Sequence, residues 1–182
     1  MCTLGGMVSN NSSGQRSVKY GTTKQYILGL EVVLPTGEVM VTGGVRSRAL
    51  KSVAGYDLTS LMVGSEGTLG VVTRIRLKVL PLPEKRGLVI AFFDQLESTG
   101  QAVVQVFRRR LFPSAIEIMD QSAMHAARLY NPELVLPEAE AMLLFEVDGS
   151  PPDVAYQAKA ISEVCAQFAR KVEWTDDPER LK

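Results

Sequence analysis

The sequence is poor in the residues that mark several classes of protein. Its 182 residues include only two cysteines, Cys2 and Cys165, which are too far apart to suggest a disulfide scaffold or a metal-binding pattern. A single histidine excludes any metal site or mechanism that needs two histidines. Lysine plus arginine and aspartate plus glutamate both number 20, so no net charge points to nucleic acid. We therefore expect a cytoplasmic globular protein with reduced thiols.

Long apolar runs are also missing. Spanning a bilayer takes about 18 apolar residues, and the longest near-apolar run, Gly87–Phe93, has the length of a strand. The first residues lack the basic opening and apolar stretch of a signal peptide. Because the chain starts directly in a stretch rich in Gly, Asn and Ser, we expect it to be a truncated chain or a partial reading frame.

The first half of the chain is predicted to contain a β-hairpin. Residues 1–24 are polar, glycine-rich and prone to turns. Gln25–Leu34 reads as a strand, Pro35–Glu38 as a tight turn, and Val39–Thr42 as the returning strand. These apolar runs on either side of a Pro-x-Gly turn are the clearest local pattern in the chain.

Two further elements follow the hairpin. After a polar loop at 43–52, Leu58–Val63 is predicted as a short helix or turn that Asp57 could cap. Val71–Leu80 alternates like a half-buried antiparallel strand. Its predicted inner face consists of Val71, Thr73, Ile75, Leu77 and Val79.

The pattern changes after a proline-rich linker at 81–85. Strands and amphipathic helices then alternate, which favours an α+β architecture of the ferredoxin-like type, with helices on one face of an antiparallel sheet. Strands are predicted at Leu88–Phe93, Ala115–Met119, Ala141–Val147 and Lys171–Trp174, and helices at Gln95–Arg110, Gln121–Tyr130 and Asp153–Arg170.

Two glycine-rich segments are the main candidates for ligand binding, namely Leu4–Gly14 and Gly64–Gly70. Glycine lets a ligand approach the backbone closely, and Asn and Ser add short donors and acceptors. The first segment could equally be a flexible, solvated terminus, and the second could be a structural turn. Neither is a Walker loop or a Rossmann fingerprint, since no Gly-Lys-Ser/Thr follows and a strand rather than a helix comes after the second.

Other candidate residues favour structural roles. His125 is expected on a helix, where a lone histidine is more often a packing or surface residue than a catalyst. Arg108–Arg110 is expected to interact with the C-terminal dipole of its helix, and Tyr56 and Asp57 to form a hydrogen-bonded turn. No catalytic residue and no metal ligand is identified.

The amino-acid sequence of the second glycine-rich segment resembles that of a known family. Gly55-Tyr56-Asp57-Leu58, a short spacer and Gly64-Ser65-Glu66-Gly67-Thr68-Leu69-Gly70 resemble the signature of FAD-linked oxidases, within a run that extends from Lys51 to Thr73. Thr3-Leu4-Gly5-Gly6 with Asn11-Ser12-Ser13-Gly14 is similar to another FAD segment of this family, and the hairpin lies between them in register. The family includes glycolate oxidase flavoprotein subunits, D-lactate dehydrogenases and D-2-hydroxyglutarate dehydrogenases, of the vanillyl-alcohol oxidase superfamily. The resemblance is strong over 3–83 and looser over 88–182.

The resemblance implies an FAD-binding domain and a reaction. Residues 1–83 would be the second part of the FAD-binding domain, and 84–182 part of the substrate domain. The first segment would pass beside the flavin and pyrophosphate, and the second would pack along the adenosine half, partly through backbone groups. The implied cofactor-binding residues are Gly5, Gly6, Ser9, Asn11, Gly14, Glu66, Gly67, Val71 and Val72. The implied reaction oxidises a 2-hydroxy acid to a 2-oxo acid with hydride transfer to the flavin, which needs a further electron acceptor.

The resemblance also sets limits. The family's first FAD loop and its paired histidines have no counterpart in this sequence, so we expect the chain alone to bind FAD weakly or not at all. One alternative is a non-catalytic subunit or assembly module that works with partner subunits, and another is a fragment that self-associates to bury apolar surface. In the parent protein, peripheral membrane association would be compatible with a cytoplasmic location.

Overall fold

The computed structural model describes residues 2–44 and 53–177, which form two compact units. The first unit contains residues up to Gly14 and Gly21–Pro81, and the second contains Gln15–Tyr20 and the chain from Leu82 onward. Predictions for 45–52, including Lys51 and Ser52 at the start of the signature run, lie outside the described residues. No helix of the described ranges is long and apolar enough to cross a bilayer.

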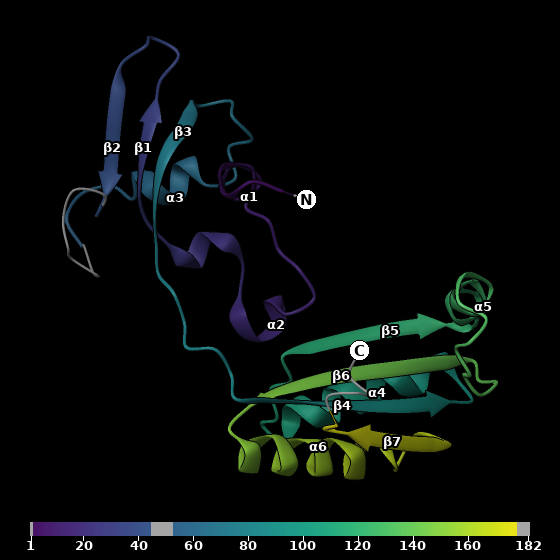
Figure 1. Cartoon of the computed structure of the whole chain (residues 1–182). Coiled ribbons are helices and arrows are strands. Elements are labelled where there is room, and N and C mark those ends of the chain that lie inside the picture. The colour runs from purple at the N-terminus through teal and green to yellow at the C-terminus, as the bar shows by residue number, and fades with distance from the viewer. Residues whose placement is uncertain (1, 45–52, 178–182) are drawn as a thin grey trace. The chain divides into compact units, whose positions relative to one another are not determined.

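The first unit is a three-stranded antiparallel sheet with helices on one face (Figure 1). The strand order is β2-β1-β3. Its elements are α1 (Leu4–Asn10), a 3-10 turn (Thr23–Tyr26), β1 (Ile27–Val33), β2 (Val39–Gly43), α3 (Leu58–Met62) and β3 (Val71–Leu77). The core consists of Val8 from α1, Leu30 and Val32 from β1, and Met62 and Val63 at the end of α3.

The predicted hairpin is confirmed, with β1 and β2 paired from Gly29–Gly43 to Val33–Val39. The backbone N–H of Leu34 donates to the carbonyl of Glu38, and that of Gly37 donates to Leu34, both at 2.9 Å. Gly37 has φ of 86°, a conformation that glycine adopts without the cost that a Cβ would bring. The strand begins at Ile27 rather than Gln25, because a 3-10 turn precedes it.

The prediction that residues 1–24 are prone to turns is wrong over the part that forms α1. Leu4–Asn10 is a helix, which Thr3 caps by accepting a hydrogen bond from the N–H of Gly6 at 3.1 Å. Asn11 ends it in the left-handed conformation. Val8, which is buried, anchors this helix in the core, so tertiary packing outweighs the poor helix propensity of its two glycines.

The predicted inner face of β3 is also wrong in part. Val71 is 66% exposed and Thr73 is exposed, whereas Val72 and Ile75 pack against the core. The pairing with β1 shifts by one residue between Glu31–Arg74 and Val32–Val72, which is a β-bulge. A bulge reverses the alternation of faces, and it leaves no clear mark in the sequence.

The second unit has the predicted ferredoxin-like arrangement, with sheet order β5-β6-β4-β7 and every neighbouring pair antiparallel. Helices α4 and α6 cover one face of the sheet, and α2 and α5 lie against the other (Figure 1). Its elements are α2 (Ser17–Tyr20), β4 (Lys85–Phe93), α4 (Leu96–Arg108), β5 (Ala115–Asp120), α5 (Gln121–Tyr130), β6 (Ala141–Gly149), α6 (Pro151–Cys165) and β7 (Lys171–Thr175).

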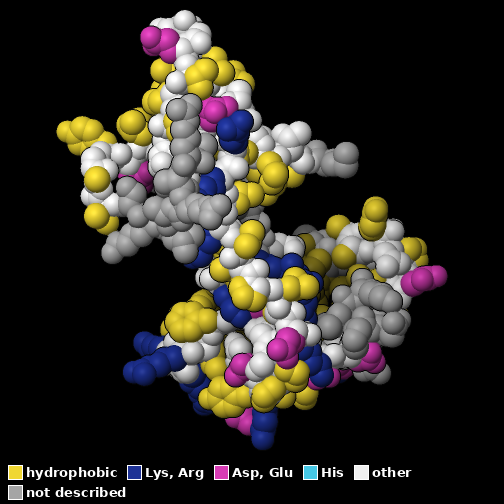
Figure 2. Space-filling view, turned by 60° about the vertical axis from the view of Figure 1, so that its left-hand side comes forward, with side chains coloured by type: hydrophobic (Ala, Val, Ile, Leu, Met, Phe, Trp, Pro, Cys, Tyr) yellow, Lys and Arg dark blue, Asp and Glu magenta, His cyan; other side chains and the backbone are white. Residues whose placement is uncertain are grey.

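The alternation along β4 and β6 builds the core of this unit. Val89, Phe93, Leu143 and Phe145 are buried together against α4 and α6. The opposite face of the same strands carries Phe92 and Met142 under α5, and the charged residues Glu146 and Asp148 further along β6. Over the surface seen in Figure 2, basic and acidic side chains are interspersed.

Helix α6 begins and ends at other residues than the predicted Asp153 and Arg170. It begins at Pro151, because proline is favoured in the first turn, where its missing N–H has no helical partner. It ends at Cys165 instead of Arg170, and Arg170 then donates its backbone N–H to Phe92 at the start of β7. The side of α6 that faces the sheet, including Ala158 and Ile161, is as predicted.

Thiol reactivity tests the packing of α6. Cys165 is fully buried, and burial raises the pKa of its thiol to about 12, whereas Cys2 is exposed. Burial disfavours the charged thiolate, so the neutral thiol favours the folded state. This contribution to the free energy of unfolding is fully present below the unfolded pKa of about 8.5 and is lost as pH rises toward 12. At pH 8, we expect a thiol reagent to label Cys2 alone in the native protein and both cysteines in denaturant. Rapid labelling of two native thiols would contradict this packing.

Candidate functional site

The two glycine-rich segments, far apart in the sequence, lie side by side in the first unit. The N–H of Gly64 donates to the carbonyl of Val8 at 3.0 Å, and the N–H of Glu66 donates to the carbonyl of Ser9 at 2.8 Å. The second segment thereby satisfies carbonyls at the end of α1. These bonds make one continuous surface from two segments that each could have been an isolated loop.

The first segment leaves α1 through a tightly bonded turn. Asn11 has φ of 51°, and the N–H of Ser12 donates to the carbonyl of Met7 at 2.9 Å, which closes the helix end. The side-chain oxygen of Asn11 accepts from the N–H of Lys24 at 2.9 Å. Thr23 donates to the carbonyl of Ser12 through both its N–H, at 3.2 Å, and its hydroxyl, at 2.7 Å. The interpretation of this segment as a flexible terminus is therefore wrong.

The second segment reverses direction through three residues with positive φ. Gly64, Glu66 and Gly67 have φ of 86°, 53° and 78°. Glu66 is the unusual member, since a side chain in this region costs about 1 kcal/mol relative to glycine. The hydroxyl of Thr68 donates to the carbonyl of Ser65 at 2.6 Å and holds the turn closed.

The glycines of the site fall into two groups. A Cβ at Gly70 would lie 2.6 Å from both a methyl group of Val32 and the carbonyl of Val33, so this glycine is needed for packing against β1. A Cβ at Gly5, Gly14 or Gly67 would meet no atom within 4 Å. Packing accounts for Gly70, and the positive φ accounts for Gly67, but neither accounts for Gly5 or Gly14.

Val71 and Val72 lie at the start of β3, where they pair with Val33 and Val32. Since β3 is at the edge of its sheet, only one side of its backbone pairs with another strand of the described chain. The other side pairs with no strand of the described residues, and recognition through backbone groups of these two valines would use that side.

The Gly55–Leu58 part of the signature caps α3. A side-chain oxygen of Asp57 accepts from the N–H of Ser60 at 2.9 Å. That interaction with Ser60 holds the pKa of Asp57 below its ordinary value. The predicted cap and turn are confirmed. A cavity of about 520 Å³ lies between this segment and the β1–β2 hairpin, and Tyr56 is among its lining residues.

Other predicted candidates lie in the second unit. His125 lines a cavity of about 530 Å³ together with Arg128 and Glu138. Arg128 donates to the carbonyls of Leu136 and Pro137 at 3.0 and 2.9 Å, which gives it a structural role. Arg108 is in the last turn of α4, and Arg110, with φ of 59°, takes the left-handed position that follows a helix. Within residues 2–44 and 53–177, no three His, Cys, Asp or Glu side chains are grouped so that they could hold a metal.

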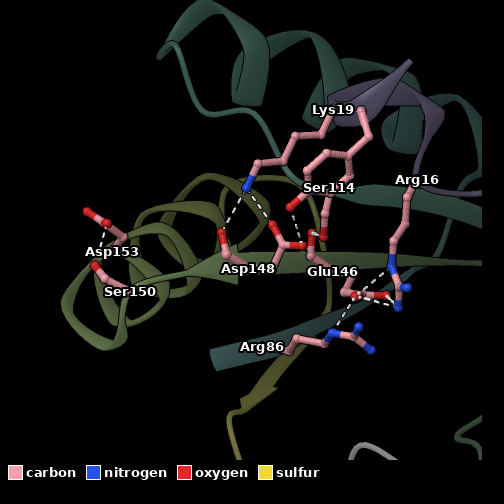
Figure 3. Close-up of polar contacts among 9 residues, drawn as sticks. Arg16, Lys19, Arg86, Ser114, Glu146, Asp148, Ser150 and Asp153 are labelled. Carbon is pink, nitrogen blue, oxygen red and sulfur yellow. Dashed lines mark hydrogen bonds and ion pairs between the residues drawn. The ribbon is translucent and has the colours of Figure 1, made fainter. Parts of the chain in front are cut away.

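One polar cluster was not predicted. Glu146 and Asp148, two residues apart on β6, bind Arg16 and Lys19, respectively (Figure 3). Asp148 also accepts a hydrogen bond from the hydroxyl of Tyr20. The period of two along a strand places both carboxylates on one face, but two charges on a strand usually indicate a solvated face. Nothing in the sequence pairs them with a segment about 130 residues earlier.

Comparisons with known proteins identify the family. The profile of the FAD linked oxidases, C-terminal domain, matches residues 82–182, and that of an FAD binding domain matches residues 1–43. The chain belongs to the FAD-linked oxidase family. It is 39% identical to glycolate oxidase subunit GlcD of Bacillus subtilis (strain 168), over 90% of this chain and 34% of that protein. It is 40% identical to D-lactate dehydrogenase of Anaerostipes hadrus, over 81% of this chain and 32% of that protein.

The fold is shared with a solved structure. Alkyldihydroxyacetonephosphate synthase matches 93% of this chain, over 34% of its own chain, with a TM-score of 0.72 at 19% identity. In sequence, the chain spans about a third of the length of the curated relatives it matches. The family prediction and the predicted α+β fold are confirmed.

Substitution of Gly70 tests the packing of the second glycine-rich segment. We expect Gly70→Ala to lower the free energy of unfolding by about 1–3 kcal/mol, because the new methyl group would collide with backbone and side-chain atoms of β1. Gly14→Ala is the matched control, and its stability should stay within about 0.5 kcal/mol of the parent, since its Cβ has open space. Equal denaturation midpoints for the two variants would show that the segment does not pack in this way.

Proposed function

We propose that this chain supplies part of the FAD site of a flavoenzyme that oxidises a 2-hydroxy acid to a 2-oxo acid. The observation that carries the proposal is the direct pairing of the two glycine-rich segments, through Val8 with Gly64 and Ser9 with Glu66. In this proposal residues 1–83 belong to the FAD-binding domain and 84–182 to the substrate domain. FAD, when bound, supplies the acceptor for the hydride.

The residues of the paired segments fit a dinucleotide. Gly5 and Gly14 leave open space beside the backbone, which suits close approach of the flavin and pyrophosphate. Gly6, Ser9 and Asn11 lie on the same segment, and Asn11 carries amide N–H donors in addition to the oxygen that accepts from Lys24. We assign these five residues to the flavin and pyrophosphate side.

The second segment fits the adenosine side. The carboxylate of Glu66 accepts hydrogen bonds and would repel a phosphate, so a ribose hydroxyl is the better partner. Gly67 follows it in a left-handed turn, and Val71 and Val72 offer the open side of an edge strand. We assign no catalytic residue within this chain, which would bind and orient the cofactor.

The substrate class rests on the relatives. Glycolate oxidase and D-lactate dehydrogenase are named for glycolate and D-lactate, which are both 2-hydroxy acids. The identity of 39–40% supports the same class for the whole protein. The electron acceptor and a cytoplasmic location are parts of the proposal that these names do not specify.

A second candidate function is a non-catalytic subunit or assembly module. It is favoured by one observation, that the relative from Bacillus subtilis is named as a subunit. This candidate predicts association with a partner chain and no effect of FAD. Flavin titration therefore separates the two candidates.

An absorption titration tests FAD binding. We expect weak binding by this chain, because it spans about a third of its relatives. FAD added to high micromolar protein should perturb the flavin bands at about 370 and 450 nm, and a desalting column should remove it. No perturbation at any concentration would contradict the proposed site. Stoichiometric flavin after desalting would contradict the expected weakness and would call for testing 2-hydroxy acids for bleaching.

Gly5→Ala separates folding from binding. Alanine in the first turn of α1 should raise the free energy of unfolding by up to about 1 kcal/mol, because glycine is a poor helix former and a methyl group here meets no atom. FAD binding should nevertheless weaken, since the methyl group would occupy the space beside the backbone. Gly100→Ala in α4 is the control, because it also replaces an unpacked helical glycine and should leave flavin binding unchanged. Unchanged binding by Gly5→Ala would remove Gly5 from the site.

A further inference from the structure

A cavity of about 530 Å³ in the second unit has no part in the proposed FAD site. It lies between α5 and the segment that precedes β6. Its lining residues are Gln121, Ser122, Met124, His125 and Arg128 from α5, and Glu138 and Ala139 from the segment before β6. Small-molecule sites have volumes of about 300–1,000 Å³, so the cavity is of a suitable size. All of its lining residues belong to one unit, and the argument below uses no other part of the chain.

One face of α5 forms the first wall of the cavity. Residues three and four positions apart lie on the same side of a helix, and this side carries Gln121, Met124, His125 and Arg128. Met124 is only 1% exposed and packs with Phe92 of β4, which fixes the rotation of α5 on the sheet. The buried methionine therefore turns the polar residues of the same face toward the cavity.

Arg128 brings a positive charge to the cavity. Its Nη2 atom donates to the carbonyls of Leu136 and Pro137 at 3.0 and 2.9 Å, which holds the guanidinium against the second wall. Its Nε and Nη1 atoms donate to no group within residues 2–44 and 53–177. A guanidinium that is fixed in this way and keeps N–H donors matches the two oxygens of a carboxylate.

Glu138 brings a negative charge to the second wall. Its backbone carbonyl accepts a hydrogen bond from the side chain of Arg170, which helps to hold this segment in place. None of the ion pairs among the described residues includes Glu138 or Arg128, so the two charges are not paired with each other. The cavity therefore presents one positive and one negative group that are kept apart.

We propose that this cavity binds a small zwitterion, namely an α-amino acid with an apolar side chain. Its carboxylate pairs with Arg128 and its ammonium with Glu138, while its side chain lies toward the apolar lining residues Met124 and Ala139. The imidazole of His125 supplies a further hydrogen bond. A ligand with a carboxylate alone would leave Glu138 without a partner and would be repelled by it. The inference goes beyond the proposed function and does not depend on FAD.

Proton NMR offers a direct test, because His125 is the only histidine in the sequence and its imidazole signals report on this cavity. Leucine is the test ligand, and 2-hydroxy-4-methylpentanoate, which carries a hydroxyl in place of the ammonium, is the matched comparison. At constant neutral pH, leucine should shift the imidazole signals in a saturable way, with a dissociation constant below about 10 mM. The hydroxy acid should bind at least about threefold more weakly, because it brings no cation to Glu138.

Two variants separate the charges. Glu138→Gln should bind leucine about three- to tenfold more weakly and the hydroxy acid no more weakly than the parent, since the ammonium loses its partner whereas the carboxylate loses a repulsion. Arg128→Lys keeps the charge but not the planar fork, so both ligands should bind at least about threefold more weakly. An unreactive Cys165 shows that the second unit is still folded in each variant.

The control is Glu140→Gln, which makes the same change of charge at an exposed residue that does not line the cavity. It should bind both ligands as the parent does. No saturable shift of the His125 signals by leucine up to about 50 mM would overturn the site. Equal binding of the two ligands by the parent, or equal leucine affinities of Glu138→Gln and Glu140→Gln, would overturn the assignment of a zwitterion.

Discussion

The candidate site depends on two backbone hydrogen bonds, from Gly64 to Val8 and from Glu66 to Ser9. Val8 contributes twice, because its side chain is buried in the core while its carbonyl receives the second glycine-rich segment. Burial of a valine side chain stabilises by about 1.5–3 kcal/mol, which offsets the low helix propensity of Gly5 and Gly6. Without this anchor, the first segment would have little reason to be ordered.

The glycines near Val8 occupy their positions for different physical reasons. Gly70 lets β3 approach β1, and Gly64 and Gly67 allow the backbone to turn with positive φ. These three would be glycine in a protein of any function. Gly5 is required neither by close packing nor by a positive φ, and it weakens its own helix. The fold alone therefore does not explain this glycine. That contrast is a stronger argument for ligand approach than the number of glycines, because loops are rich in glycine whatever they do.

Sequence patterns predicted most of the elements, because period and turn chemistry are local. The β1–β2 hairpin, the cap at Asp57, helix α5 and the ferredoxin-like arrangement of the second unit all followed from them. The helix at Leu4–Asn10 was missed because its stability comes from the burial of Val8, which is a tertiary contact. The inner face of β3 was missed because one bulged residue at Thr73 reverses the alternation. The binding role of the glycine-rich segments came from a resemblance and stays a prediction.

The polar cluster of Glu146 and Asp148 with Arg16, Lys19 and Tyr20 shows why polar tertiary contacts are the hardest part of a structure to predict. Glu146 and Asp148 carry the pattern of an exposed strand face, and Arg16 and Lys19 that of a polar turn. Water could solvate the charged side chains of either segment alone. Asp148 is buried only because the two segments pack together. Burying a carboxylate is costly unless its partners are in place, so this contact contributes specificity of attachment more than stability.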